Sequence, residues 1–357
     1  MPIILSYART PFSAAFGRLA QHSAAQLGAA AIAGAAARGR IEPSEIDMCI
    51  FGHVLTAGCG PQPAAEAARI AGATRASALS VSQGAASSLA AVGFSGLRGV
   101  TAAVGMESVS RTPHIFRRSA MNLISDLSLE DSVKADAVDK QMALHAENLE
   151  ISRIDQDAYA LESYRRAAAG WSSGFFAKEV EAIAGVDKDD LFTQMTLTTL
   201  PSYKPIFVKD TGSITAANSA KLADGAACVI IAADDFVKKH KLEGLARIRA
   251  SLDLPGQADD AVRAALRCAV VPIQAVDFWE IQEDFACNVI DLSRKLKLDA
   301  SRVNMHGGAI SLGNPLGASG ARLVGSLSRI LNSRSARFGC AVARHSAGTS
   351  VVVLEKM

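Results

Sequence analysis

The chain has 357 residues, of which 49% are hydrophobic and 20% are charged, and its formal net charge is +2. This length and composition are typical of a soluble globular protein with two domains or one large two-lobed unit. The small net charge gives no electrostatic reason to expect nucleic acid as a partner, and no apolar run reaches the roughly 18 residues that span a bilayer. The six cysteines form no paired motif, which predicts reduced thiols and no metal site.

Strands and helices alternate through the first hundred residues. Such alternation indicates βαβ units and a mostly parallel sheet that is covered on both faces. The expected elements are a strand at Ile3–Tyr7, a helix at Ala24–Arg38, a strand at Ile46–Val54, a helix at Pro63–Ala71, a strand at Ala78–Ser82, a turn entering a helix at Gln83–Leu97 and a strand at Val100–Val104.

Between Glu107 and Lys209 the pattern changes to charged helical segments and polar loops, which indicates an insertion. Strands and helices return after it. The expected elements in these later parts are helices at Leu129–Ile151 and Arg153–Ser172, a strand at Ala226–Ala232, helices at Ala233–His240 and Asp259–Cys268, a strand at Ala275–Ile281, a helix at Leu323–Leu331, and strands at Phe338–Ala343 and Val351–Glu355.

The two ends of the chain share a local pattern. In each, a helix is followed by a proline, Pro43 or Pro272, and a few residues later by an aliphatic residue and an aspartate, Ile46-Asp47 or Val276-Asp277. This pattern suggests an internal duplication.

The stretch 303–322 contains five glycines and a central proline. Glycines at this density permit close backbone approach to a ligand or to a neighbouring loop. Neither of the common nucleotide-binding fingerprints is present. His306 and His345 lie in small-residue loops, and Glu283-Asp284 follow a strand, so each is either an acid–base group or a structural hydrogen-bonding residue. The residues alone therefore predict an α/β protein with a ligand cleft.

Several motifs follow one another in order along the whole chain. These are Ala8-Arg9-Thr10-Pro11, Phe51-Gly-His-Val-Leu-Thr-Ala-Gly-Cys-Gly-Pro-Gln-Pro, Gly105-Met-Glu-Ser-Val-Ser, His145-Ala-Glu-Asn, Gly212-Ser-Ile-Thr-Ala-Ala-Asn, Asp224-Gly-Ala-Ala and the glycine-rich stretch 303–322. On these motifs the sequence resembles, from end to end, the thiolase superfamily, whose members cleave or form 3-ketoacyl-CoA.

The resemblance implies the α/β thiolase fold. This fold has two duplicated βαβαβαββ halves that form a five-layered αβαβα core, with a helical loop domain. We expect residues 1–106 and 207–245 to form the first half, residues 107–206 the loop (lid) domain, and residues 246–357 the second half.

At the positions where the family has its catalytic groups, this sequence has other residues. Ala85 stands in place of the nucleophilic cysteine, and Asn314 in place of the histidine that activates it. The remaining two catalytic loops contain Gln282 and Arg344, and the loop that includes Arg344 is similar to that of the sterol-carrier-protein type. Cys287 lies near the third loop, where we expect a core thiol.

From these departures we expect a degenerate thiolase-like protein of fatty-acid or sterol metabolism. It would bind CoA or an acyl-CoA weakly and lack 3-ketoacyl-CoA thiolase activity. Two alternatives are an enzyme with an aldol- or hydration-type reaction on a CoA thioester, which would use Asp284, His345 or Glu283 as its base, and a non-enzymatic scaffold subunit.

The resemblance also implies where a CoA thioester would bind, with no metal or further cofactor. The contact residues that it implies are Ser219, Ala220, Phe285, Gly348 and Met142. Basic candidates for the adenosine phosphate are Lys204, Lys209 and Arg117.

Assembly and location are less determined by the sequence. The segment 85–106 is shorter than its thiolase counterpart, so we expect either a monomer or a dimer. The first acidic residue is Glu42, and four arginines precede it. Such a start is typical of a mitochondrial targeting segment, or it is simply the first strand and helix of a cytoplasmic protein. The C-terminal Glu-Lys-Met is not a peroxisomal signal.

Overall fold

A computed structural model of the chain describes residues 1–96, 99–115, 118–120, 123–124, 130–131, 140–191 and 199–357. Nine strands form one continuous sheet in the order β12-β13-β14-β11-β1-β10-β5-β3-β4, and β2 (Ser13–Ala14) pairs with β10 beside it. The strands are β1 (Ile3–Arg9), β3 (Met48–Gly52), β4 (Ser77–Val81), β5 (Val100–Glu107), β10 (Ala223–Ala232), β11 (Ala246–Leu254), β12 (Val276–Ile281), β13 (Phe338–His345) and β14 (Gly348–Lys356).

The sheet is mixed, so the prediction of a mostly parallel sheet is wrong. Among the described strands, β3 pairs in parallel with β4 and β5, and β12 with β13. The pairs of β1 with β10 and β11, of β5 with β10, and of β14 with β11 and β13 are antiparallel. The physical reason is that a two-residue turn at 346–347 joins β13 directly to β14, and such a hairpin can only pair its strands antiparallel.

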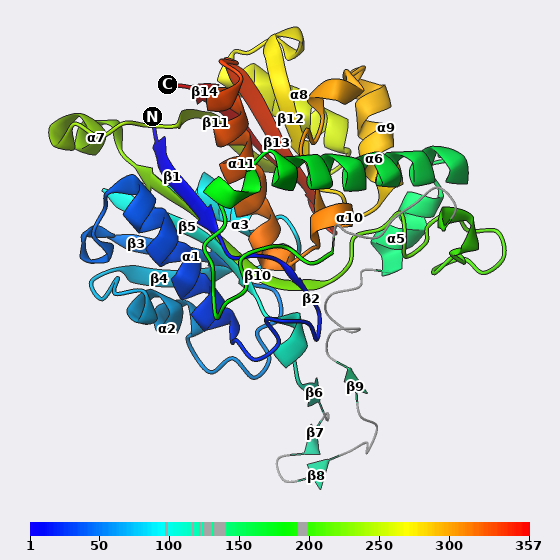
Figure 1. Cartoon of the computed structure of the whole chain (residues 1–357), viewed down its shortest axis with the longest axis horizontal. Coiled ribbons are helices and arrows are strands. Elements are labelled where there is room, and N and C mark those ends of the chain that lie inside the picture. Colours follow the sequence, from blue (N-terminus) through cyan, green and yellow to red (C-terminus); the bar gives the residue numbers. More distant parts are fainter. Residues whose placement is uncertain (97–98, 116–117, 121–122, 125–129, 132–139, 192–198) are drawn as a thin grey trace.

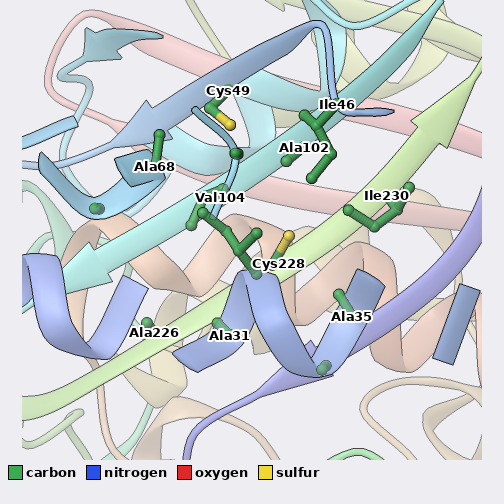
Figure 2. Close-up of a cluster of buried hydrophobic side chains, with 14 of the residues drawn as sticks. Ala31, Ala35, Ile46, Cys49, Ala68, Ala102, Val104, Ala226, Cys228 and Ile230 are labelled. Atoms are coloured by element: carbon green, nitrogen blue, oxygen red, sulfur yellow. The ribbon is translucent and has the colours of Figure 1, made fainter. Parts of the chain in front are cut away.

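Helices cover the outer face of each half of this sheet, and two further helices lie between the two halves. On the first half, Ala102 and Val104 of β5 point to an outer cluster with α1 (Ala24–Gly39) and α2 (Pro63–Ile70), part of which is drawn in Figure 2. Ala103, between them, points to the central helices α3 (Ser87–Gly93) and α11 (Ser319–Ser333). Successive side chains of a strand alternate between its faces, so each strand of this half serves both clusters.

The second half repeats this arrangement. Val342 of β13 packs outward with α8 (Ala258–Ala269) and α9 (Ala286–Leu296), whereas Ala341 and Ala343 face the same central helices. The order of layers is therefore helix, sheet, helix, sheet, helix, and Figure 1 shows the two halves joined edge to edge where β1 meets β11. The five-layered core that the resemblance implies is confirmed.

The duplication extends to single residues. Counted outward from the junction of β1 and β11, β3 corresponds to β12 and β5 to β13, and only β4 lacks a counterpart in this order of described strands. In the first half Asp47 accepts a hydrogen bond from the backbone N–H of Val100, at the start of β5, at 2.9 Å. In the second half Asp277 accepts one from Phe338, at the start of β13, at 3.0 Å. The two aspartates noted in the sequence thus accept equivalent hydrogen bonds, each from the first residue of the neighbouring strand.

Other elements differ from expectation in detail. The helix α6 (Arg153–Ser172) has the predicted bounds, and α7 spans Asp234–His240. The expected helix at Leu129–Ile151 is α5 (Lys140–Glu147), while residues 132–139 lie outside the described part. We did not predict β11 or α9, nor the short α10 (Ala309–Leu312) inside the glycine-rich stretch.

Short strands lie beside the core in the region expected to be a loop domain. The strands β6 (His114–Ile115) and β9 (Glu130–Asp131) pair, as do β7 (Arg118–Ala120) and β8 (Leu123–Ile124), and Figure 1 shows both pairs extending away from the main sheet. The proposed domain boundaries stay a prediction. Across the described residues, no helix combines the length and the apolar character that crossing a bilayer requires.

A buried ionic network ties the segment after α6 to the core. Arg9, at the end of β1, donates to Glu179 at 2.8 Å and to both oxygens of Asp189 at 2.7 and 2.8 Å. Arg329 of α11 pairs with the other oxygen of Glu179 at 3.1 Å. The side chains of Arg9, Glu179 and Asp189 are fully buried, so their charges depend on one another for solvation.

Replacing Arg9 with methionine is expected to destabilise the protein by about 3–5 kcal/mol, because it leaves the buried carboxylates of Glu179 and Asp189 without their main partner. Urea unfolding followed by circular dichroism measures this change. The control Arg267→Met removes an exposed arginine of α8 and is expected to change stability by no more than about 0.5 kcal/mol. Equal effects of the two substitutions would contradict the role assigned to the network.

Candidate active site

Loops from both halves of the fold converge on one cavity of about 530 Å³. Ala85 comes from the loop between β4 and α3, Asp284 from the loop between β12 and α9, Asn314 from the glycine-rich stretch, and Arg344 and His345 from the end of β13. The positions aligned with the family's catalytic groups thus meet around one space. The exception is Gln282, which is buried and does not line the cavity.

Asp284 and Asn314 are in direct contact at this cavity. The amide nitrogen Nδ2 of Asn314 donates to Oδ1 of Asp284 at 3.3 Å, and Gln282 Nε2 donates to the same oxygen at 3.2 Å. On the other side, Ser319 Oγ donates to Oδ1 of Asn314 at 2.8 Å. Because Ser319 occupies the carbonyl oxygen of the amide, the N–H groups of Asn314 face Asp284 and the cavity.

Asp284 is a titratable group that lines the cavity and whose pKa is shifted by its surroundings. Burial raises its pKa to about 6, because the ionised carboxylate loses solvation, and hydrogen bonds from Gln282 and Asn314 together with the charge of Arg344 partly oppose this rise. A carboxyl group with this pKa is mostly ionised at neutral pH and accepts a proton more readily than an ordinary aspartate. Such a group is suited to general base catalysis.

The loop before α3 presents a methyl group to the cavity. Ser87 organises this loop, since its hydroxyl accepts from the backbone N–H of Gln83 at 2.8 Å and donates to the carbonyl of Gly84 at 2.6 Å. Ala85 is nearly buried at the cavity wall. An alanine side chain offers no nucleophile, so a covalent intermediate at this position is chemically excluded.

Glu283 lies outside the cavity, although it is adjacent to Asp284 in sequence. Its carboxylate is fully buried and accepts hydrogen bonds from Tyr159 (2.8 Å), Ser163 (2.9 Å), Asn304 (2.9 Å) and the backbone of Ile310 (3.1 Å). Four donors saturate both oxygens. This arrangement links α6 to the catalytic loop and leaves no lone pair directed at a substrate.

His345 and Arg344 differ in how they are held. His345 Nε2 contacts Asp253 Oδ1 at 2.9 Å, and Gln83 donates to the second oxygen of the same aspartate. Within the described residues, the side chain of Arg344 donates one long hydrogen bond, from Nη1 to Oδ1 of Asn288 at 3.4 Å. The imidazole is therefore oriented by a carboxylate, whereas the guanidinium group retains most of its donors.

Most of the expected ligand contacts line the cavity. Ser219, Ala220, Phe285 and Met142 do so, and the backbone N–H of Ala220 donates to the carbonyl of Asp284 at 3.0 Å. Gly348 lines a neighbouring cavity instead. A Cβ atom at Gly348 would lie 2.2 Å from the carbonyl oxygen of Leu254, so the close packing of β14 against β11 requires this glycine.

The other sequence candidates lie elsewhere. His306 stacks on Phe175 with ring centroids 3.8 Å apart, and burial lowers its pKa to about 4. Cys287 is buried in the core, where burial raises the pKa of its thiol to about 12. Lys204 and Lys209 do not line the main cavity, and Arg117 lies outside the described residues. No cluster of three metal-ligating side chains occurs in the described part of the chain.

Glu107 is a site residue that the sequence reasoning missed. Its buried carboxylate accepts from the backbone N–H groups of Val54 (3.1 Å), Leu55 (2.9 Å) and Gly317 (3.1 Å), and burial raises its pKa to about 7. It thereby holds the cavity-lining Val54 and the turn that includes Leu316. The signal was available, because an acidic residue that ends a mostly apolar strand needs buried donors.

Comparison with known proteins identifies relatives over the whole chain. Residues 2–235 match the family model for the thiolase N-terminal domain, and residues 251–356 match that for the thiolase C-terminal domain. The mitochondrial acetyl-CoA acetyltransferase of Rattus norvegicus is 33% identical, with 99% of this chain and 91% of that protein covered. The cytosolic acetyl-CoA acetyltransferase of Gibberella zeae is 32% identical, with 99% and 98% covered.

Solved structures show the same similarity. Human mitochondrial 3-ketoacyl-CoA thiolase in complex with CoA has a TM-score of 0.94 and 30% identity, and the comparison covers 100% of this chain and 98% of that one. A thiolase from Ascaris suum in complex with coenzyme A has a TM-score of 0.94 and 29% identity, with both chains fully covered.

These relatives contradict the expectation of a chain without thiolase activity, because full-length relatives at about a third identity are named acetyl-CoA acetyltransferases. The expectation equated the absence of a cysteine and a histidine with the absence of acyl transfer, although the cavity contains a poised carboxylate and an amide donor. The alternatives of an aldol- or hydration-type enzyme and of a non-enzymatic scaffold are set aside with it.

Replacing Asn314 with alanine is expected to raise the pKa of Asp284 above about 6, because the ionised carboxylate loses a hydrogen-bond donor. Carbon-13 NMR titration of the aspartate carboxyl groups measures the shift. The control Ser328→Ala removes a hydroxyl of α11 that donates to the Gly325 carbonyl, and it should leave the titration unchanged. An unchanged or lowered pKa in Asn314→Ala would refute the contact.

Proposed function

We propose that this chain, which belongs to the thiolase family, is an acyltransferase that forms or cleaves the carbon–carbon bond of 3-ketoacyl-CoA thioesters in its main cavity. The names of its full-length relatives support acyl transfer, and the thiolase structures with bound CoA support a CoA thioester as the ligand. The observation that carries the proposal is the Asp284–Asn314 pair at the point where the catalytic loops converge.

Asp284 is the proposed general base. In the thiolysis direction its carboxylate takes the proton of the CoA thiol, and the sulfur attacks the 3-keto carbon of the substrate. The carbon–sulfur bond forms and the bond between C2 and C3 breaks. The electron pair left on C2 then takes the proton back from Asp284, so the base is regenerated and two thioesters leave.

This direct route is proposed because Ala85 stands where the family has its nucleophile. A thiolase reaction usually passes through an acyl-cysteine, which separates the two substrates in time. With a methyl group at that position, both thiol and thioester must be bound together. We also propose that the chain is similar to the sterol-carrier-protein type. We propose as well that it lacks the family's catalytic cysteines and histidine.

Asn314 is the proposed donor to the developing negative charge. An amide nitrogen carries two N–H groups, of which one is directed at Asp284. The second is suited to a substrate carbonyl oxygen, where charge accumulates during the attack. Preorganised donors of this kind stabilise transition states strongly, and Ser319 holds the amide in the required orientation.

The remaining residues have supporting roles in this proposal. Glu283 positions the loop through its four buried hydrogen bonds, and His345 is held by Asp253 at the rim. Ser219, Ala220, Phe285 and Met142 contact the thioester arm. CoA enters as a substrate, and we propose no metal or further cofactor.

Assembly and location are proposed only in broad terms. The strand β4 ends the sheet as an edge, and Leu79 on it is 41% exposed. A monomer or a dimer is compatible with this edge, and light scattering of the purified chain decides between them. The mitochondrial and cytosolic names of the relatives support either compartment, and a fluorescent fusion to the C-terminus locates the chain.

Replacing Asp284 with asparagine is expected to lower kcat by about 10²–10⁴-fold, because the amide cannot take up the proton. The assay follows loss of acetoacetyl-CoA in the presence of CoA. In the wild type, kcat/KM should rise with pH and level off above about 6, since the base acts only when it is ionised.

Two results test this role. The control Asp291→Asn replaces an α9 carboxylate that pairs with Lys295, and it should retain the wild-type rate and pH profile. Wild-type thiolysis that does not exceed the uncatalysed rate would refute the proposed function. Thiolysis that Asp284→Asn does not slow would refute only the role of Asp284.

Initial rates measured over a grid of both substrates are expected to give intersecting rather than parallel double-reciprocal lines, because the direct route needs both substrates bound at once. Parallel lines are the pattern of a covalent intermediate. Iodoacetamide should leave the rate unchanged, since the cavity contains no cysteine among its lining residues. Rapid inactivation, protected by acetoacetyl-CoA, would show that a cysteine takes part after all.

A further inference from the structure

A second cavity of about 370 Å³ adjoins the main one. The two cavities share four lining residues, Met142, Arg344, His345 and Ser346. A group attached to a thioester carbonyl near Asp284 can therefore extend past Arg344 into the second space. The proposed reaction assigns no role to Arg344, which lies at the boundary of the two cavities.

The ionisable side chains that line the second cavity, among the described residues, are all basic. Among the residues that the structure describes, no aspartate or glutamate lines it, whereas Arg344 and the imidazoles of His145 and His345 do. The backbone of the 346–348 turn, with Gly256 and Gln257 opposite, completes its wall. A space of this size lined by a guanidinium and two imidazoles, and by no carboxylate, favours an anionic occupant.

Arg344 is also incompletely partnered within the described chain. No carboxylate of the described residues lies within ion-pairing distance of its guanidinium group, whose hydrogen bond to Asn288 is 3.4 Å long. Its charge influences Asp284 through space, without a direct ion pair between them. Arg344 is partly buried, and its guanidinium group presents five donors in a fork that matches a carboxylate.

We propose that Arg344 makes this enzyme select acyl-CoA substrates whose acyl group ends in a carboxylate. This inference rests on the proposed function, because it assumes that a CoA thioester occupies the main cavity. The acyl carbonyl lies beside Asp284 and Asn314, and the terminal carboxylate pairs with Arg344 at the boundary of the two cavities. His345 is less suited to this role because Asp253 already occupies it.

A phosphate of CoA offers the same anionic chemistry, so the experiment must separate the two sources. Succinyl-CoA and butyryl-CoA have four-carbon acyl groups and the same CoA moiety, and they differ in a terminal carboxylate against a methyl group. Isothermal titration of both ligands, and of free CoA, into the full-length chain isolates the carboxylate. The ratio of the two thioester affinities cancels every contact with the CoA phosphates.

The wild type is expected to bind succinyl-CoA at least about tenfold more tightly than butyryl-CoA, as a hydrogen-bonded charge pair implies. Arg344→Gln should abolish this preference while leaving the affinity for butyryl-CoA within about twofold. Arg344→Lys should retain part of it, because lysine keeps the charge and loses the fork. The control Arg267→Gln, at an exposed position of α8, should bind all three ligands as the wild type does.

Three outcomes overturn the inference. Equal affinities of the wild type for the two thioesters would exclude a carboxylate site without recourse to any variant. Arg344→Gln weakening free CoA and both thioesters alike would assign Arg344 to a CoA phosphate. Binding of neither thioester would overturn the proposed function together with this inference, whereas the first two outcomes leave the proposed function standing.

Discussion

The central helical layer can form only because backbone approaches backbone with no side chain between. A Cβ atom at Gly105 of β5 would lie 2.3 Å from the Cα of Ala318, and one at Gly320 of α11 would lie 2.1 Å from the backbone nitrogen of Leu89 in α3. Real Cβ atoms do not approach other atoms so closely, so these positions accept only glycine. The start of α11 is thereby pressed against β5 and α3 at once.

This close contact is what makes the site. It holds the glycine-rich stretch that carries Asn314 against the helix whose preceding loop carries Ala85, and Glu107 adds a buried carboxylate that binds the adjoining turn at Gly317. The loop that carries Asp284 comes from the other half of the fold and meets Asn314 across the cavity. Two halves that are each stable by layer packing thus share one site along the seam where their central helices meet.

Part of this arrangement could be predicted from the sequence and part could not. The bounds of α6 and the paired aspartates Asp47 and Asp277 follow from local pattern, and the motifs identify the fold. Strand direction does not follow, because a strand such as β10 that is buried on both faces reads as a continuous apolar run in either direction. The sequence also does not show that Glu283 and Asp284 have different environments. Adjacent side chains point in different directions, and only tertiary contacts show that Glu283 accepts hydrogen bonds from four donors while Asp284 lines the cavity.

The absence of a cysteine at position 85 has a different meaning once the geometry is known. A covalent mechanism depends on a nucleophile and on a histidine that activates it, and the positions that the resemblance aligns with these two groups are Ala85 and Asn314. A direct transfer instead needs a base of suitable pKa and a donor that faces the same oxygen-binding region, with both substrates held together. Burial of Asp284 and the Ser319-oriented amide of Asn314 meet the first two needs, which is why we propose that acyl transfer follows the direct route.

The base and the proposed substrate anchor are also coupled electrostatically. The positive charge of Arg344 opposes the rise in the pKa of Asp284 that burial causes. A substrate carboxylate paired with Arg344 would neutralise that charge, which removes the opposition and raises the proton affinity of Asp284. Binding of an acyl group with an anionic end would therefore make Asp284 a stronger base, whereas an uncharged acyl group would leave it as it is in the empty cavity. On this argument Arg344 contributes to selectivity twice, through the affinity for the substrate and through the strength of the base that acts on it.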